Sequence, residues 1–146
     1  MMNVLVKRLT DSAILPVKGS LEAACFDLHV DSVIRDARGW HVQTGIAVAL
    51  PPGNVMLIFP RSGLSTKLGL ILRNTIGVID SDYRGEILLK FAPGFTSAQD
   101  DVMVALKPGS RVAQAMILQL PAVVLQEVSE LPETDRGVGG FGSTGV

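Results

Sequence analysis

The sequence predicts an all-β protein: a distorted jelly-roll or β-barrel-like single domain with at most one short helix. Three observations lead to this prediction. Short apolar and β-branched segments recur at close spacing, glycine and proline clusters separate them, and no long amphipathic helical pattern competes with them. The chain has 146 residues, of which 47% are hydrophobic and 18% charged, so it can bury one core and is not disordered in composition.

The expected strands can be given in chain order. They are residues 3–9, 26–30, 40–44, 46–50, 55–59, 70–79, 87–91, 102–106, 112–120 and 123–128. Residues 11–22 contain Pro16 and Gly19 and predict an irregular connection. The one short helix allowed by the pattern lies over residues 64–68, where proline and glycine interrupt the strands.

Apolar and polar residues alternate in the second expected strand. Phe26, Leu28 and Val30 share one face, while Asp27 and His29 share the other. We therefore expect the Asp27 carboxylate to point away from the core.

One predicted turn is unusually polar for its apolar flanks. Residues 74–79 and 87–91 suit the two strands of a hairpin, and Asp80, Asp82 and Tyr83 stand between them. Carboxylates in turns often accept hydrogen bonds from backbone amides, while loops also carry functional residues. The turn alone leaves a structural and a chemical role open for its carboxylates.

Charge and cysteine content limit the partners and the compartment. The net charge is −1 and the pI about 6.1, so we expect no stable nucleic-acid binding. The sequence has a single cysteine, Cys25, so no disulfide can form within the chain, and this cysteine content is typical of proteins in a reducing compartment. Because the sequence contains only two histidines, His29 and His41, in addition to this cysteine, a structural zinc site is not expected. The sequence has no apolar leader and no run of membrane-spanning length, so we expect a cytoplasmic protein without membrane association.

Residues 129–146 differ from the rest of the chain. Five of these eighteen residues are glycine, and the segment is too poor in large apolar residues to form a core. We expect residues 1–128 to form the domain and residues 129–146 to form a flexible arm. Residues 136–145 combine glycines, hydroxyls, a cation and an aromatic ring, as a phosphate-binding loop does, but match neither a Walker A loop nor a dinucleotide fingerprint.

Five stretches of the chain occur in a specific order. They are Ala23 to Leu28, Pro60 to Leu64, the polar turn with Asn74 before it, Gly109 to Gln114, and Arg136 to Gly145. In this order they resemble the five motifs of the trimeric dUTP diphosphatase (dUTPase) family, over nearly the whole chain. Three positions depart from the family pattern: Ala23 stands in place of serine, Cys25 of glycine and Ser110 of an acidic residue.

The resemblance implies an enzyme that uses Mg²⁺ to hydrolyse dUTP to dUMP and pyrophosphate, with water attacking the α-phosphate. It implies Asp80 as the general base, and Asp27 as an outer-shell ligand that reaches Mg²⁺ through water. The implied substrate-binding residues are Arg61, Ser62, Gly63, Asn74, Gly77, Ile79, Tyr83, Gln114, Arg136, Phe141, Gly142, Ser143 and Thr144. Such an enzyme keeps uracil out of DNA and supplies dUMP for dTMP synthesis.

The resemblance also implies how the substrate is selected and enclosed. A strand edge and the Asn74 side chain present donors and acceptors that match uracil, and cytosine would leave some of them unpaired. Tyr83 would pack on the deoxyribose and exclude a 2′-hydroxyl, and Phe141 would stack on the base. The family is a homotrimer with shared active sites, so the arm of one chain would close over a site formed by its neighbours.

Two other functions are compatible with the fold. A dCTP deaminase needs a carboxylate aimed at the pyrimidine C4, but a water-activating Asp80 and an intact glycine-rich arm favour the diphosphatase. A regulatory protein switched by a nucleotide would be expected to carry an inserted loop or domain, for which 146 residues leave no room. Within the motifs, Asp82 is interpreted as a carboxylate that shapes the turn or pairs with a nearby arginine, with direct catalysis, or metal binding together with Asp80, as the alternatives. Arg84 and Glu86 are interpreted as structural, and Arg111 as either a phosphate ligand or a structural ion pair.

Overall fold

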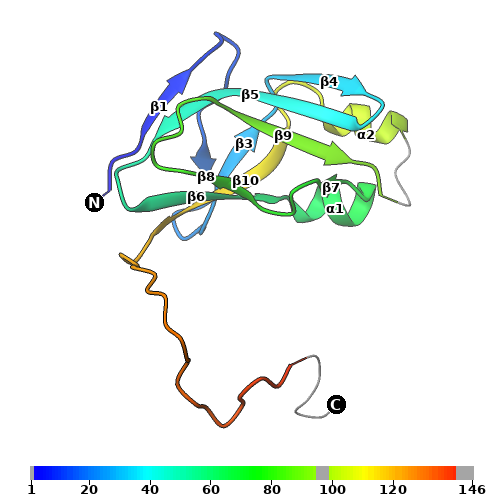
Figure 1. The fold of residues 1–146 in the computed structure, drawn as a ribbon. Helices are drawn as coiled ribbons and strands as arrows, with labels where there is room; N and C mark the ends of the chain where they lie inside the picture. The colour runs from blue at the N-terminus through cyan, green and yellow to red at the C-terminus, as the bar shows by residue number, and fades with distance from the viewer. Residues whose placement is uncertain (1, 95–98, 141–146) are drawn as a thin grey trace.

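A computed structural model describes residues 2–94 and 99–140 and shows two β-sheets packed face to face (Figure 1). The first, the β5 sheet, contains β1 (Leu5–Arg8), β4 (Ser32–Asp36), β5 (Gly39–Ala49), β7 (Ile71–Leu72) and β9 (Glu86–Ala92). The second, the β10 sheet, contains β2 (Val17–Lys18), β3 (Phe26–His29), β6 (Asn54–Pro60), β8 (Gly77–Ile79) and β10 (Arg111–Gln119). Two short helices, α1 (Ser62–Leu68) and α2 (Gln99–Ala105), lie at one end of the sheets.

The predicted all-β class is confirmed, and the described strands form two sheets rather than a closed barrel. The strand orders are β1-β5-β9-β7, with β4 also pairing with β5, and β2-β3-β10-β6-β8. Each antiparallel sheet buries one face. Along β9, for example, Ile87, Leu89 and Phe91 are buried, and Leu88 and Lys90 are exposed.

Side chains from both sheets form a single core. Ile46 and Phe91 from the β5 sheet belong to the same buried cluster as Leu28 and Ile58 from the β10 sheet. Burying a side chain of this size typically contributes about 1.5–3 kcal/mol. This core fixes the sheets to each other and leaves the polar ends of the strands at the surface.

The expected strand over residues 102–106 is wrong, because this segment belongs to the second helix. Val102 and Leu106 are fully buried, while Met103 and Val104 between them are 43% and 67% exposed. Buried positions four residues apart follow the helical period, whereas a strand would also bury Val104. The chain therefore has two short helices among its described residues, not at most one.

The expected hairpin is also wrong. β8 pairs with β6 in one sheet, and β9 pairs with β5 and β7 in the other, so residues 80–85 cross between the sheets. Each of the two strands finds a partner elsewhere in the chain, which the polar turn between them does not reveal. The expected strand over residues 70–79 is likewise split into β7 and β8 by a turn in which Thr75 has a φ of 61°.

Two expected strands are one in the structure. Residues 40–44 and 46–50 join through Gly45, whose φ is 63°, to form β5, and the pairing of β5 with β9 shifts register between Gln43 and Ala47. The structure also adds β4 and, within the expected irregular connection of residues 11–22, the two-residue strand β2, neither of which the sequence pattern indicated.

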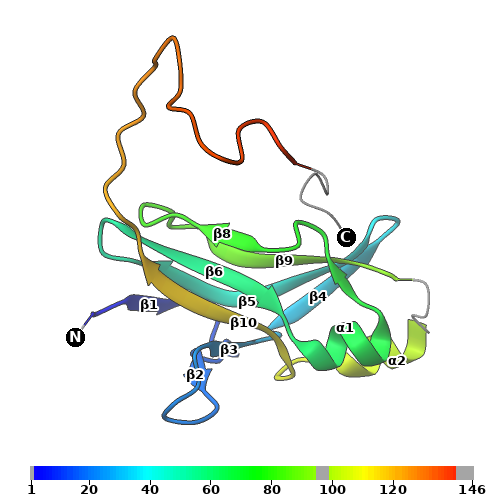
Figure 2. The same ribbon diagram turned by 90° about the horizontal axis from the view of Figure 1, so that it is seen from below.

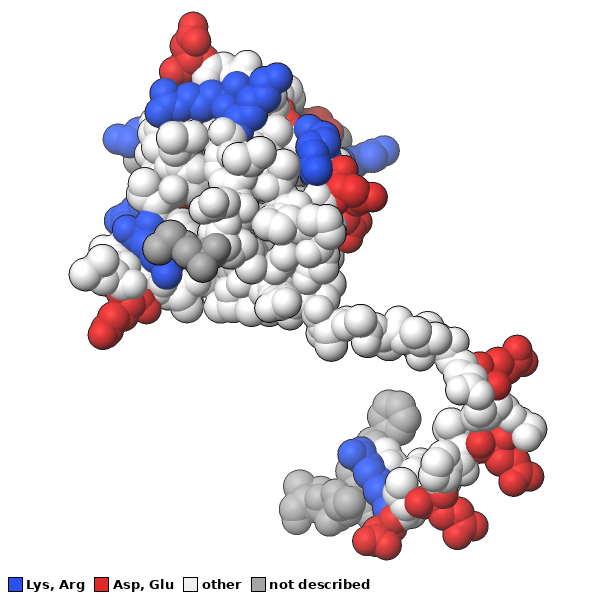
Figure 3. Space-filling view, turned by 90° about the vertical axis from the view of Figure 1, so that its left-hand side faces the viewer, with Lys and Arg blue, Asp and Glu red and all other residues white. Residues whose placement is uncertain are grey.

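The chain after β10 runs away from the body without forming a strand (Figure 2). The expected strand over residues 123–128 is therefore wrong for this chain alone: Val123, Val124 and Leu125 are 70%, 91% and 93% exposed. Figure 3 shows acidic side chains along this segment. They are Glu127, Glu130, Glu133 and Asp135. The division into a domain and an arm stays a prediction.

Candidate active site

A carboxylate and two guanidinium groups meet at one end of the β10 sheet. Oδ1 of Asp27 in β3 lies 3.3 Å from Nε of Arg61, and Oδ2 lies 3.3 Å from Nη1 of Arg111. Arg61 also donates a hydrogen bond from Nη1 to the Arg111 carbonyl oxygen at 3.4 Å. Asp27 is only 14% exposed, whereas the arginines are 33% and 53% exposed. The carboxylate thus fixes two cations that keep free N–H donors at the surface, which suits an anion.

The pairing of three strands brings distant motifs together in this cluster. The partner of Asp27 in β10 is Gln114, whose own partner in β6 is Phe59. Residues directly opposite each other share a face of the sheet, so the Gln114 and Asp27 side chains lie next to each other. Gln114 donates from Nε2 to the Pro60 carbonyl oxygen at 3.3 Å. The first, second and fourth motifs therefore meet within one chain.

Arg61 marks the transition from β6 to α1. Its backbone is extended, with φ −81° and ψ 135°, and the helix begins at the next residue. Ser62 and Gly63 are exposed beside it, while Leu64 is buried and anchors the helix to the core. The three residues predicted from the second motif thus lie together at the surface.

His29 is a neighbour of this cluster that the sequence pattern did not assign to the site. Burial lowers its pKa, the Asp27 carboxylate opposes that shift, and the Arg111 and Arg61 cations add to it. The imidazole is therefore neutral at neutral pH. The signal for its position was its spacing of two residues from Asp27 in an alternating strand.

Asp80 is exposed at the start of the connection between β8 and β9, and this connection has a fixed shape. The Tyr83 amide donates to the Asp80 carbonyl oxygen at 3.2 Å, and the Tyr83 hydroxyl donates to the Glu86 carbonyl oxygen at 3.0 Å. The Tyr83 ring packs against Gly85, where an added Cβ would come within 2.3 Å of the hydroxyl oxygen. Any larger residue at this position would displace the Tyr83 ring from its present place.

Other polar residues of the connection contact the backbone. Arg84 donates from Nη1 to the carbonyl oxygens of Ser81 and Tyr83, at 2.7 and 2.9 Å. The Glu86 carboxylate accepts a hydrogen bond from the Gly45 amide at 2.8 Å. These contacts agree with a structural role for both residues. Asp82 is exposed and makes no side-chain hydrogen bond or ion pair with the described residues, so its turn-shaping role stays a prediction.

The residues expected to read the base lie on an outer strand. β8, which contains Gly77 and Ile79, is the last strand of the β10 sheet, so one edge of its backbone pairs with no other described strand. A Cβ at Gly77 would lie 3.1 Å from the Ile58 Cβ, so glycine permits this close approach. Asn74 is exposed in the turn that precedes the strand.

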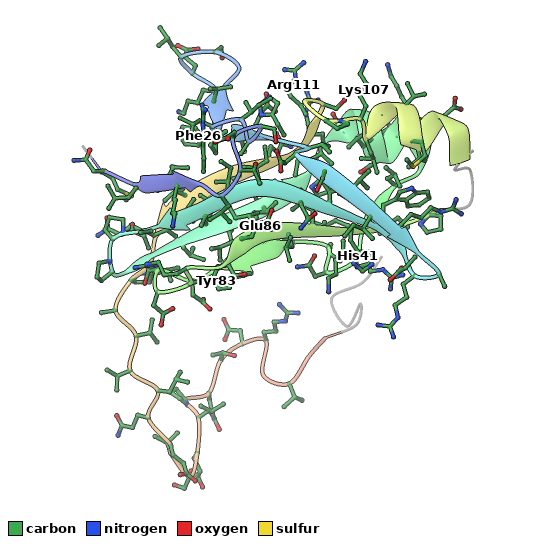
Figure 4. The ribbon with its side chains drawn as sticks, turned by 90° about the horizontal axis from the view of Figure 1, so that it is seen from above. Phe26, His41, Tyr83, Glu86, Lys107 and Arg111 are labelled. Carbon is green, nitrogen blue, oxygen red and sulfur yellow. The ribbon has the colours of Figure 1, made fainter. Side chains whose placement is uncertain are left out.

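The two parts of the predicted site lie apart within one chain. Ile79 pairs with Met56 in β6, and Arg61 follows five positions further along. At roughly 3.3 Å per residue, this separation is about 16 Å along the strand. Figure 4 accordingly shows Arg111 and Tyr83 on opposite sides of the body. A general base must lie within hydrogen-bond reach of its water, and within one chain Asp80 lies well beyond that reach from the cluster around Asp27.

Arg136 is exposed in the segment that follows β10, and its Nε donates to the Gly139 carbonyl oxygen at 2.9 Å. The other residues predicted from the fifth motif, Phe141, Gly142, Ser143 and Thr144, lie outside the described residues. Among the side chains that the structure describes, no three His, Cys, Asp or Glu residues are grouped closely enough to hold a metal ion. Neither described helix has the length and apolar character needed to cross a membrane.

The fold and this cluster together define a two-sheet all-β protein with an anion site suited to phosphate groups. The family model described as dUTPase matches residues 11–145. Relatives named deoxyuridine 5′-triphosphate nucleotidohydrolase include one from Paramecium bursaria Chlorella virus 1, 43% identical, and one from Dictyoglomus turgidum, 38% identical, each matched over 100% of both chains. The dUTPase of Staphylococcus bacteriophage 80alpha, solved with dUpNHpp, is 25% identical and superposes with a TM-score of 0.80 over 99% of each chain. The chain belongs to the dUTPase family.

Proposed function

We propose that this dUTP diphosphatase hydrolyses dUTP to dUMP and pyrophosphate by attack of an activated water on the α-phosphate. The observation that carries the proposal is the cluster of Asp27, Arg61 and Arg111, to which separate motifs contribute. The planar guanidinium group of arginine matches phosphate oxygens in pairs. That a family member was solved with dUpNHpp supports a deoxyuridine nucleotide as the ligand.

The phosphate-binding part of the site would consist of Arg61, Ser62, Gly63 and Gln114. This assignment is supported by the grouping of these residues at one end of the β10 sheet, where Gln114 also contacts the end of β6. Preorganised cations and donors of this kind stabilise the charge that develops on a phosphate during its transfer.

Asp80 would deprotonate or orient the attacking water. This role is supported by the exposure of Asp80 on a connection whose shape is fixed by the Tyr83 hydrogen bonds. A positioned general base typically contributes a factor of about 10²–10⁴ to the rate.

A homotrimer with shared active sites would bring the two parts together. The separation of Asp80 from the Asp27 cluster in one chain supports this assembly, because a second copy can supply the missing base. Exposed apolar surface supports the assembly as well. Val124 and Leu125 are almost fully exposed, and an apolar hollow of about 500 Å³ is lined in part by Val6 and Phe26. The C-terminal arm of a neighbour, with Arg136, Phe141, Gly142, Ser143 and Thr144, would then close over the site.

Mg²⁺ would bind mainly through the substrate phosphates, with Asp27 contributing through water. Both Asp27 oxygens already pair with an arginine, which suits an outer-shell contact better than direct coordination. When bound, the ion supplies charge neutralisation and orientation of the triphosphate.

The edge of β8 would read the uracil. The free backbone edge of β8, the strand that contains Gly77 and Ile79 and follows Asn74, supports this assignment because a strand edge offers donors and acceptors in alternation. Tyr83, whose ring is held against Gly85, would pack on the deoxyribose and exclude a 2′-hydroxyl. We further propose a cytoplasmic enzyme that keeps uracil out of DNA and supplies dUMP, without stable nucleic-acid or membrane binding.

Replacing Asp80 with asparagine tests this function. Pyrophosphate release from dUTP should fall at least a hundredfold, within the range expected for loss of a general base, while calorimetric affinity for dUpNHpp is retained. Asp82→Asn is the matched control and should keep its turnover. Near-normal turnover in Asp80→Asn would remove Asp80 from this role. Ammonia released from dCTP by the unaltered protein, without pyrophosphate from dUTP, would instead indicate a deaminase.

A further inference from the structure

Within residues 121–140, local hydrogen bonds are concentrated in one unit, residues 134–139, which we call the Arg136 turn. The Gly137 amide donates to the Thr134 carbonyl oxygen at 3.0 Å and to Thr134 Oγ1 at 3.1 Å. The Gly139 amide donates to the Arg136 carbonyl oxygen at 3.0 Å. The Arg136 side chain closes the unit by donating from Nε to the Gly139 carbonyl oxygen at 2.9 Å.

The turn fixes the guanidinium group and leaves most of it available. Arginine has five N–H donors, and the contact with Gly139 uses only the one on Nε. The four donors on Nη1 and Nη2 remain to meet phosphate oxygens in pairs. Arg136 is thus held to its own backbone on one side and open to a ligand on the other.

Among the described residues of this turn, only Thr134 and Arg136 contribute side chains to its hydrogen bonds. Its hydroxyl accepts from the amide of Gly137, the residue that reverses the chain with a φ of 48°. Residues 134–138 are exposed and Gly139 is only half-buried, so burial does little to hold this conformation in the single chain. The hydroxyl therefore contributes directly to keeping the turn formed.

We propose that Thr134 is a positioning residue that presets Arg136 for phosphate binding before the arm docks. This inference rests on the proposed function, in which Arg136 binds the phosphates of dUTP. Ordering backbone at the moment of binding costs free energy, and a turn that exists beforehand avoids part of that cost. Thr134 lies outside the glycine-rich stretch of residues 136–145 and would not contact the substrate itself.

The test begins with Thr134→Val, which removes the hydroxyl and keeps the shape. We expect kcat/KM for dUTP to fall about three- to tenfold, the effect of losing one hydrogen bond. Thr134→Ser should restore most of it. Ser129→Ala is the matched control, because it removes a hydroxyl from the same segment outside the turn, and it should have no effect. A Thr134→Val enzyme with unchanged kcat/KM would overturn the proposal.

A double-mutant cycle with Arg136→Ala identifies the route of the effect. If Thr134 acts through Arg136, adding Thr134→Val to Arg136→Ala should cause no further loss. An equal loss in both backgrounds would show that the hydroxyl acts elsewhere and would overturn the proposal.

A second readout does not depend on catalysis. In the full-length protein without nucleotide, NMR should show slower hydrogen exchange at Arg136 Nε and at the Gly137 amide in the unaltered chain than in Thr134→Val. Equal exchange would overturn the preset turn. If the unaltered protein releases no pyrophosphate from dUTP, the proposed function fails, while this measurement still decides whether the turn exists.

Discussion

Asp27 is the residue on which the proposed phosphate-binding part of the site depends. Its carboxylate is largely buried, yet both of its oxygens are paired with arginines that reach the surface. Truncating one partner of such a group leaves the others with unpaired charge, so the three side chains act as a unit. Arg111, for which the sequence left two roles open, is tied into this unit through both its guanidinium group and its carbonyl oxygen.

The two contacts of Arg61 depend on the planar shape of its guanidinium group, and the substitution Arg61→Lys tests this dependence. Nε contacts Asp27 while Nη1 contacts the Arg111 carbonyl oxygen, and a lysine ammonium cannot reproduce both contacts at once. We expect the affinity for dUpNHpp to fall about tenfold or more, as for loss of a charged hydrogen bond, when measured by calorimetry. Arg38→Lys, in the turn between β4 and β5, is the control and should bind normally. Unchanged affinity in Arg61→Lys would contradict this view of the cluster.

At the scale of elements, periodicity predicted most strands but not their partners. The alternation along β3 and β9 and the apolar runs of β6 and β10 are local properties, so the sequence contains them. The choice between β8 pairing with β9 or with β6 depends on contacts such as Gly77 with Ile58, which lie far apart in sequence. The same limit applies to the site: the motifs predict its residues, but only the strand register shows which of them meet in one chain.

Two short apolar segments that the sequence predicts as strands are not strands in the structure. Residues 102–106 suit a strand or a helix equally well by composition, and only the burial of positions four apart distinguishes them. Residues 123–128 have β-forming side chains but no described partner strand within the chain. A strand is defined by its pairing, so propensity alone could not decide its state.

Gly45 is the point at which β5 changes register, and a pair of glycine substitutions tests its role. Gly45 and Gly53 both have positive φ, at 63° and 75°, but a Cβ at Gly45 would come within 2.7 Å of the Ala13 Cβ, whereas Gly53 has open space. Gly53→Ala should cost about 1–2 kcal/mol from backbone strain alone. Gly45→Ala should cost clearly more, because Ala13 must also move. Denaturant unfolding measures both, and equal losses would mean that the close approach at Gly45 is not maintained.

At the scale of the whole molecule, the single chain has two incomplete parts of a site on different sides of one body. The cluster at Asp27 lies apart from the Asp80 carboxylate, and the one cation within residues 80–85, Arg84, is already hydrogen-bonded to two backbone carbonyl oxygens. The segment after β10, which we propose as a third part of the site, carries apolar residues that its own body does not cover (Figures 2 and 3). A closed assembly of identical chains would account for all three features, because the Asp80 connection and the C-terminal segment of one copy could lie next to the Asp27 cluster of another.

Mixing two inactive variants tests this assembly. Asp80→Asn chains keep the cation cluster, and Arg61→Ala chains keep the base, so a site shared between two different chains can contain both intact parts. Refolding the variants together at equal amounts should restore about one quarter of the normal activity, because random assembly in a closed ring pairs an intact Arg61 with an intact Asp80 in that share of sites. Pyrophosphate release from dUTP is the measurement. Refolding each variant alone should restore nothing, and a mixture that is as inactive as its components would show that each chain must provide both residues to its own site.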